Sequence, residues 1–271
     1  MNPETHVHRA RLHKLASLAF DRPGDELTDA LESGEFVRQL VESARALESE
    51  ALVDHAEAVA DHSPSDEAGI ETLERQYADL FGFENGGELS QYEIEYSPGT
   101  ILTSTDTLAD LSGFYRAFNL STVDGARDRS DHLCLELEFC SHLALQTAYL
   151  QQTGDETGIG VLENAQADFL DDHLGRWIPR FRETVEEEAE VAFYRELAGL
   201  LDELIAADAE RFGTEPKVFP ETPPSPTENF IGGDEEGDFR CNGCGIDNMP
   251  GQNPTLPNAP GRPERNRNGP N

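Results

Sequence analysis

Two cysteines near the C-terminal end, Cys241 and Cys244, have the most reactive side chains of the sequence. Two thiols with two residues between them can form a disulfide, or they can supply half of a zinc site, which needs about four ligands. The other cysteines, Cys134 and Cys140, lie far away and provide no second pair. Three readings stay open: an unstructured thiol pair, a metal site completed by a partner or a second copy, and a redox pair without a thioredoxin-like βαβ context.

Tyrosines and glutamates alternate in the segment Tyr92-Glu93-Ile94-Glu95-Tyr96. Aromatic rings can stack on a peptide, and the hydroxyl and carboxylate groups beside them can hold it by hydrogen bonds. The same side chains can also pack a loop against the rest of the protein. The segment is therefore a candidate for peptide binding through Tyr92, Glu93 and Tyr96, with loop packing as the alternative.

A further candidate pair, Asp131 and His132, precedes a long apolar stretch. Asp131 is well placed to be the N-cap or a first-turn acid of a helix, and His132 can be a solvated surface histidine. Upstream, Gly113 lies in the middle of a predicted helix with Tyr115 and Arg116. Because glycine inside a helix costs up to about 1 kcal/mol relative to alanine, Gly113 indicates the close approach of another helix or of a ligand.

Motifs of the common enzyme classes are missing from the sequence. It contains no glycine-rich phosphate loop with its lysine, no His-Glu-x-x-His and no Gly-x-Ser-x-Gly. No nucleophile or general base can be named from it. We therefore expect a protein that binds rather than catalyses, and that needs no cofactor.

Helices must position these candidate residues, because helical periodicity runs from the start of the chain to about Gly213. The stretch from about Asp131 to Gln151 is apolar around most of its circumference, which predicts a central helix. One helix is expected from roughly Phe36 to His62. No β alternation of useful length appears, and no strands alternate with the helices. The sequence predicts an all-α fold, a single bundle of about ten helices.

The composition changes after the helical part. Residues 214–271 are rich in proline, glycine and asparagine and cannot bury enough apolar surface to offset the entropy of ordering, so we expect a disordered tail behind a helical domain at 1–213. No uninterrupted apolar run approaches the roughly 20 residues of a spanning helix. The N-terminus lacks the basic and apolar regions of a secretory signal. We expect a cytoplasmic protein without membrane insertion.

Acidic residues dominate the charge of the chain. Asp and Glu number 54 against 20 Lys and Arg, which gives a formal net charge of -34. Such a chain repels itself, but at molar salt the Debye length is only about 3 Å, so the composition indicates a halophile's cytoplasm. A surface for a basic partner is the alternative. Nucleic acid is excluded as a partner, because no basic stripe could neutralise its phosphates.

In their order and spacing, these motifs resemble the TorD/DmsD/NarJ family of redox-enzyme maturation chaperones, over roughly residues 8–212. The family pattern has Tyr-Glu-x-x-Tyr, a helix with Gly-Phe-Tyr-Arg-Ala-Phe, Asp-His-Leu before Glu-Leu-Glu-Phe, and a later Phe with His and Trp. The matching positions are Tyr92, Glu93 and Tyr96, then Leu108 to Phe118, Asp131 to Leu133, Glu136 to Phe139, and Phe169, His173 and Trp177. Ser130 departs from the pattern, which usually has proline there.

The resemblance implies a chaperone, in a halophilic archaeal version, that binds the apo catalytic subunit of a molybdopterin oxidoreductase of the dimethyl sulfoxide or nitrate reductase type. It also implies binding of the client's twin-arginine signal peptide, around Asp131 and His132. The neighbours of that pair would be Tyr92, Glu93, Tyr96, Gly113, Tyr115 and Arg116. The chain would be a monomer by default, with a dimer possible. The alternative function is a metal- or redox-responsive regulator that acts through Cys241 and Cys244.

Overall fold

The computed structural model describes residues 2–82, 89–98, 101–121 and 129–220. Its helices are α1 (Pro3–Ala19), α2 (Asp25–Glu32), α3 (Glu35–Ala46), α4 (Glu50–His62), α5 (Glu67–Phe81), α6 (Ile101–Ala117), α7 (Leu133–Thr153), α8 (Glu156–Phe169), α9 (Gly175–Glu188) and α10 (Ala192–Phe212). A 3₁₀ turn (Glu93–Glu95) and a π-helical turn (Leu170–Leu174) complete the regular structure of these residues. The predicted all-α fold is confirmed for the described part of the chain.

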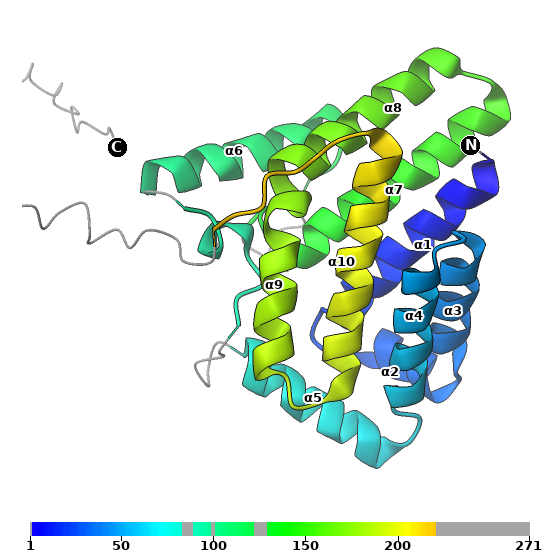
Figure 1. The fold of residues 1–271 in the computed structure, drawn as a ribbon, viewed down its shortest axis with the longest axis vertical. Coiled ribbons are helices and arrows are strands. Elements are labelled where there is room, and N and C mark those ends of the chain that lie inside the picture. Colours follow the sequence, from blue (N-terminus) through cyan, green and yellow to red (C-terminus); the bar gives the residue numbers. More distant parts are fainter. Residues whose placement is uncertain (1, 83–88, 99–100, 122–128, 221–271) are drawn as a thin grey trace, which may run out of the picture. The chain divides into compact units, whose positions relative to one another are not determined.

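Neighbouring helices follow one another around the bundle in an order different from that of the sequence. Contacts run from α9 to α10, α4, α3, α1, α7 and α8, so that the first helix lies between α3 and α7 (Figure 1). Helix α5 lies below α9 and α10 in this view, and α6 lies near the opposite end. Within the described ranges, no helix has the length and apolarity that a membrane crossing requires.

Helix α7 is the central helix that the sequence predicts. Leu133, Leu137 and Leu143 are fully buried on it, and small residues of α1, among them Ala16 and Ala19, face the same core. Small side chains let two helices approach closely, and close packing excludes water from the apolar surface between them. One side of α7 departs from the prediction, since Leu145 is 49% exposed.

The single helix expected between Phe36 and His62 is wrong, because the chain forms two helices there, α3 and α4. The break lies at Glu48, whose φ is 57°, in the left-handed region. Ser49 then caps α4, as its hydroxyl accepts a hydrogen bond from the Leu52 N–H at 3.4 Å. Folding back lets α3 and α4 pack against each other, which a continuous helix could not do.

A buried polar cluster joins α1 to α10. The Arg9 guanidinium donates to both carboxylate oxygens of Asp208, at 2.6 and 2.7 Å, and His13 Nε2 lies 2.9 Å from Asp208 Oδ2. Arg9 also contacts His6 Nδ1 at 3.1 Å and Gln166 at 3.0 Å. Burial alone would raise the pKa of Asp208, but Arg9 and His13 hold it below its usual range.

Residues 214–220, which the sequence assigns to the tail, run back along α9. Phe219 is 3% exposed, its N–H donates to the Arg176 carbonyl at 2.8 Å, and its own carbonyl accepts from Arg180 Nε at 2.8 Å. The guanidinium of Arg176 stacks on the Phe219 ring, 4.4 Å from its centroid. The domain boundary at 213 stays a prediction, and the remaining tail residues, 221–271, lie outside the described residues.

Candidate functional site

The segment around the 3₁₀ turn is fastened to the start of α7. Tyr92 and His132 form an isolated antiparallel bridge. The N–H of Glu93 donates to the Asp131 carbonyl at 3.0 Å, and the N–H of Leu133 donates to the Gln91 carbonyl at 2.8 Å. Two predicted motifs that are far apart in the sequence are therefore one structural unit.

Asp131 is fully buried within this unit. Its carboxylate accepts hydrogen bonds from the Ile94 N–H at 3.2 Å and from Arg129, at 2.9 Å from Nε and 2.6 Å from Nη2. The cap of α7 is instead His132, whose Nδ1 accepts from the Cys134 N–H at 3.2 Å. The predicted capping role of Asp131 is therefore wrong, because its carboxylate holds the 3₁₀ turn in place.

His132 is buried as well, at 7% exposure, so the expectation of a solvated surface histidine is wrong. The Tyr92 ring meets the His132 ring edge to face, with centroids 5.0 Å apart. Arg129 covers the same tyrosine, with its guanidinium carbon 4.3 Å from the ring centroid. Asp131 and His132 are therefore interior residues that contact the partly exposed Arg129 and Tyr92, and their part in client binding stays a prediction.

Glu93 and Tyr96 point into the protein from the same segment. The Glu93 carboxylate, 1% exposed, lies 3.0 Å from His173 Nδ1. The Tyr96 hydroxyl donates to the Ser90 carbonyl at 2.8 Å, and its ring packs 5.3 Å from the Trp177 ring. Burial raises the pKa of Tyr96, so this hydroxyl stays protonated. The loop-packing reading is therefore confirmed for Glu93 and Tyr96, which contact the predicted His173 and Trp177, and the peptide-binding reading stays a prediction.

The candidates of α6 divide between the interior and the surface. Tyr115 is buried, and its hydroxyl donates at 2.8 Å to the carbonyl of Ser130, next to Asp131. Gly113 and Arg116 are exposed. Among the described residues, no atom lies within 4 Å of a Cβ built at Gly113. No described helix approaches it closely, so the helix half of that expectation is wrong and the ligand half stays a prediction.

Glu136, part of the predicted Glu-Leu-Glu-Phe motif, is completely buried. Its Oε2 accepts from Trp177 Nε1 at 3.2 Å, whereas Oε1 has no hydrogen-bond partner in the described structure. Burial raises the pKa of Glu136 well above its ordinary value, and the charges of Glu93 and Asp131 add to this. Burial therefore favours the neutral form of this carboxyl group over the charged form.

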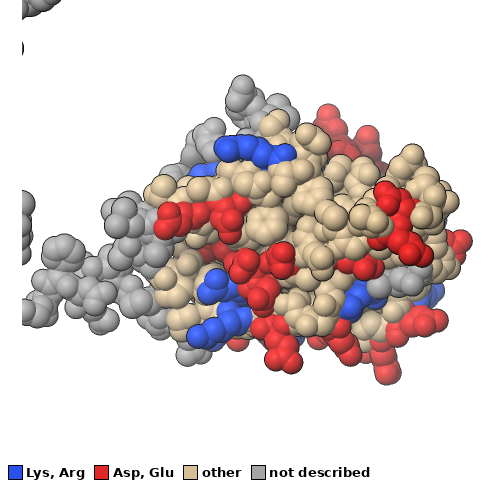
Figure 2. Space-filling view, turned by 90° about the horizontal axis from the view of Figure 1, so that it is seen from above, with Lys and Arg blue, Asp and Glu red and all other residues tan. Residues whose placement is uncertain are grey.

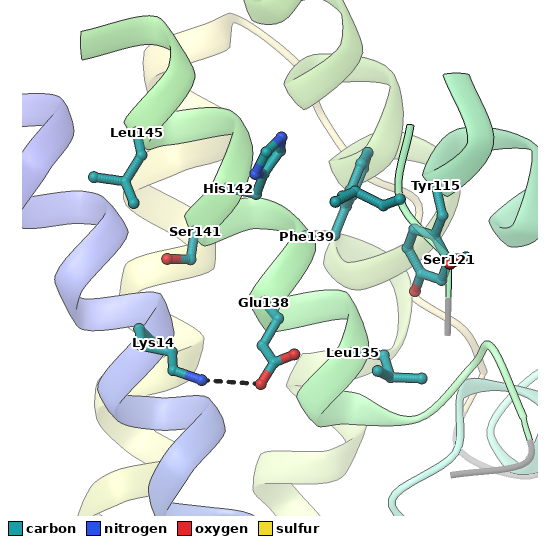
Figure 3. A pocket seen from close by; sticks show the side chains of 10 residues that line it. Lys14, Tyr115, Ser121, Leu135, Glu138, Phe139, Ser141, His142 and Leu145 are labelled. Atoms are coloured by element: carbon teal, nitrogen blue, oxygen red, sulfur yellow. Dashed lines mark hydrogen bonds and ion pairs between the residues drawn. The ribbon is translucent and has the colours of Figure 1, made fainter. Parts of the chain in front are cut away.

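A groove opens between α1, α6 and α7 (Figure 3). Its volume is about 350 Å³, and apolar side chains line most of it: Tyr115, Leu120, Leu135, Phe139 and Leu145. Lys14 from α1 and Glu138 from α7 form an ion pair at 3.0 Å across one end. Leu135, His142 and Leu145 are surface residues that the sequence interpretation missed. The signal for them was the apolar character of α7 on every side.

The described cysteines offer no metal or redox chemistry. Cys134 and Cys140 are both buried and form no disulfide, and burial raises the pKa of Cys140. No group of three or more His, Cys, Asp or Glu among the described residues could hold a metal ion. Cys241 and Cys244 lie outside the described residues, so their three readings stay open.

Comparisons with known proteins agree with the predicted resemblance. Residues 32–183 match the family model for the nitrate reductase delta subunit. The chlorate reductase assembly chaperone protein of Ideonella dechloratans is 33% identical over 150 residues, which cover 55% of this chain and 75% of the relative. The selenate reductase assembly chaperone protein of Thauera selenatis is 36% identical over 146 residues, covering 53% and 72%.

A more distant relative is the chaperone protein TorD of Aliivibrio fischeri, 24% identical over 176 residues, which cover 65% of this chain and 79% of the relative. The range matched by the family model contains the 3₁₀ turn, α6 and the fastened start of α7. That range covers more than half of the chain and includes every predicted site residue except Cys241 and Cys244. The chain belongs to the nitrate reductase delta subunit family.

Proposed function

We propose that this protein is an assembly chaperone that binds the apo catalytic subunit of a molybdopterin reductase and holds it for cofactor insertion. The observation that carries the proposal is the family match, because relatives named as assembly chaperones of reductases align over about three quarters of their length. The protein acts by binding, not by catalysis. A client of the dimethyl sulfoxide or nitrate reductase type, and action in the cytoplasm, are the narrower parts of the proposal.

The client segment, we further propose, is the apolar part of a signal peptide, which lies in the groove of Figure 3. Leu145 and Tyr149, 49% and 60% exposed, extend the apolar lining along α7. Exposed apolar side chains in a row on one helix favour an apolar partner. Tyr115 lines the groove and binds the Ser130 carbonyl, so it connects the groove to Asp131 and His132.

Affinity capture of the tagged protein from its native cells tests the function. We expect an unprocessed molybdopterin-enzyme subunit to be enriched, with less of it captured once the enzyme carries its cofactor. Capture should be repeated while the cells are making such an enzyme. If no such subunit is enriched under that condition, the chaperone proposal is wrong.

Substitutions on two exposed apolar positions test the groove. Leu145→Glu places a charge in the lining, and burying that charge opposes an apolar ligand, so client capture should fall. Val161→Glu is the matched control, because Val161 is also exposed, at 57%, but lies on α8 outside the groove lining. Equal capture by both variants would reject the groove while leaving the chaperone function standing.

We further propose, from the acidic composition, that the protein functions in a salt-rich cytoplasm. One face of the molecule carries acidic side chains spread over it, with fewer basic ones between them (Figure 2). Salt screens the repulsion between such charges. The midpoint of thermal unfolding should therefore rise with potassium chloride concentration up to molar values, and a midpoint that falls would contradict this.

The alternative, a metal- or redox-responsive regulator, depends on the Cys-x-x-Cys of the tail. Its test is a chain that ends after Pro220, which keeps the described part of the tail, including Phe219 on α9. Client capture that survives this truncation supports the chaperone. Loss of capture both in the truncated chain and in the full-length Cys241→Ser/Cys244→Ser variant would favour the regulator.

A further inference from the structure

A second hollow, of about 770 Å³, lies beside α6 and has a different chemistry from the groove. The 3₁₀ turn, α6, the π-helical turn, the start of α9 and Phe219 enclose it. Four carboxylates line it: Glu93, Asp106, Asp110 and Asp172. Arg176 is the only arginine or lysine of its lining, and that guanidinium is stacked on Phe219, with its Nε 3.4 Å from the Lys217 carbonyl. The carboxylates therefore outnumber the cations in this hollow.

His173 provides independent evidence that the hollow takes a ligand. The side chain is 3% exposed and lines the hollow, and its Nδ1 is paired with the Glu93 carboxylate at 3.0 Å. Nε2, on the other side of the ring, has no hydrogen-bond partner in the described structure, and its nearest ion-pair neighbour is Asp110 Oδ2 at 3.5 Å. A buried ring nitrogen without a hydrogen-bond partner is rare in folded proteins, so Nε2 marks a position at which the hollow can hold a ligand.

Among the described residues, the carboxylates near this nitrogen have no ion pair with an arginine or a lysine. Partial burial raises the pKa of Asp172; His173 opposes the rise, and the negative charges of Asp110, Asp171 and Asp168 add to it. Asp110 itself is 61% exposed and free to turn toward a ligand. Every acceptor of the hollow would thus be satisfied by the same kind of group, a cation with several N–H donors.

A metal ion does not fit these positions, since no three of the described His, Cys, Asp and Glu side chains are close enough to one another to hold one. A guanidinium group is planar and carries five N–H donors in a fork, so it can reach acceptors that are spread apart. We propose that the hollow binds the guanidinium group of an arginine side chain in the client peptide, through the carboxylates of Asp110 and Asp172 beside His173 Nε2. The source of the arginine rests on the proposed function; the chemistry of the hollow does not.

The outer wall of the hollow comes from a part of the chain outside the family match. Phe219 lines the hollow and is held on α9 by its bonds to Arg176 and Arg180, whereas the matched range ends at residue 183. An apolar wall lowers the local dielectric constant and strengthens the attraction between a carboxylate and a cation beside it. Phe219 is thus a positioning residue, which keeps Arg176 away from the carboxylates and water away from one side of the ligand.

A small probe tests the hollow without any client. Agmatine carries a guanidinium and no carboxylate, and it can be titrated into the full-length protein at low salt while the imidazole nitrogens of His173 are followed by NMR. We expect saturable shifts of His173 Nε2 that sodium chloride at equal ionic strength does not produce. Asp110→Asn and Asp172→Asn should each weaken agmatine binding by about tenfold, the loss of one charge-assisted hydrogen bond.

Asp171→Asn is the matched control, since it removes the same charge from the same turn at an exposed position outside the lining. Phe219→Ala should weaken agmatine binding in the same direction, provided that its unfolding curve shows a folded chain. Shifts no larger than those from sodium chloride, or an Asp171→Asn effect equal to that of Asp110→Asn, would overturn the proposal.

Client capture distinguishes a failure of the proposed arginine site from a failure of the proposed chaperone function. If the wild-type protein captures a reductase subunit and Asp110→Asn/Asp172→Asn captures it with equal affinity, the hollow is not the client's arginine site and the chaperone function stands. If the wild-type protein captures no such subunit, the function fails, and the agmatine titration still decides whether the hollow binds a guanidinium.

Discussion

Replacement of Asp208 by alanine removes the carboxylate that faces the Arg9 guanidinium inside the bundle. Arg9 and Asp208 are 1% and 2% exposed, and they share two hydrogen bonds of 2.6 and 2.7 Å. Breaking a buried pair by removing one partner leaves an uncompensated charge and typically costs about 3–5 kcal/mol. We therefore expect Asp208→Ala to lower the free energy of unfolding by that amount. His13 also loses its carboxylate partner, which places the loss toward the upper end.

The exposed ion pair between Lys14 of α1 and Glu138 of α7 provides a comparison for the buried pair. Lys14 and Glu138 are 50% and 41% exposed and lie 3.0 Å apart, and such surface pairs contribute about 0–1 kcal/mol. Lys14→Ala should therefore have little effect. Molar salt should increase the difference between the two variants, because salt screens the exposed pair and screens the buried pair much less.

Urea unfolding followed by far-UV circular dichroism measures both variants, at low and at molar potassium chloride. Asp208→Ala should lose about the same free energy at both salt concentrations, and its thermal midpoint should fall by roughly 6–20 °C for a domain of this size. A loss below about 1 kcal/mol would refute the buried pair. Arg9→Met/Asp208→Leu removes both charges, so it should regain most of the stability; no gain over Asp208→Ala would mean that packing, not charge, explains the loss.

Three further predictions concern the core, the pH dependence and the tail. Leu137→Ala, in the fully buried face of α7, should cost about 2–5 kcal/mol in urea unfolding, and a negligible cost would contradict that burial. Burial and the charges of Arg9 and Arg211 lower the pKa of His6 to about 4. Since the unfolded chain takes up this proton below about pH 6.5, stability should fall as the pH drops from about 6.5 to 4, and His6→Gln should flatten that slope. Truncation after Gly213 should destabilise the chain through the loss of Phe219, whereas truncation after Pro220 should not, and equal thermal midpoints would refute the packing of residues 214–220.

The helical architecture could be predicted from the sequence because its signals are local. Apolar periodicity predicts the run of helices up to about Gly213 and the long central helix, and both are found. The break between α3 and α4 was also encoded locally, by the N-cap residue Ser49, but the apolar and alanine-rich pattern continues across it. A short turn inside a long periodic stretch is easily missed, because periodicity alone cannot show where a helix reverses.

The sequence could predict which residues belong to the site, but not how they are buried or which residues they contact. Asp131 and His132 were identified, yet their burial depends on contacts with Ile94 and Tyr92, which local patterns do not contain. Ser130 illustrates the same limit. A proline would fix the backbone by its ring, whereas Ser130 is held by its hydroxyl bond to the Leu108 carbonyl, at 3.2 Å, and by the Tyr115 bond to its carbonyl.

The pairing of Arg9 with Asp208 also sets the order of events during synthesis. The ribosome synthesises α1 first and α10 much later. At about 5–20 residues per second, roughly 10–40 s pass between the synthesis of Arg9 and that of Asp208. Until then, the nascent chain cannot close the bundle around its first helix without burying an unpaired cation. A newly made molecule thus becomes fully folded only when nearly all its helices have been translated.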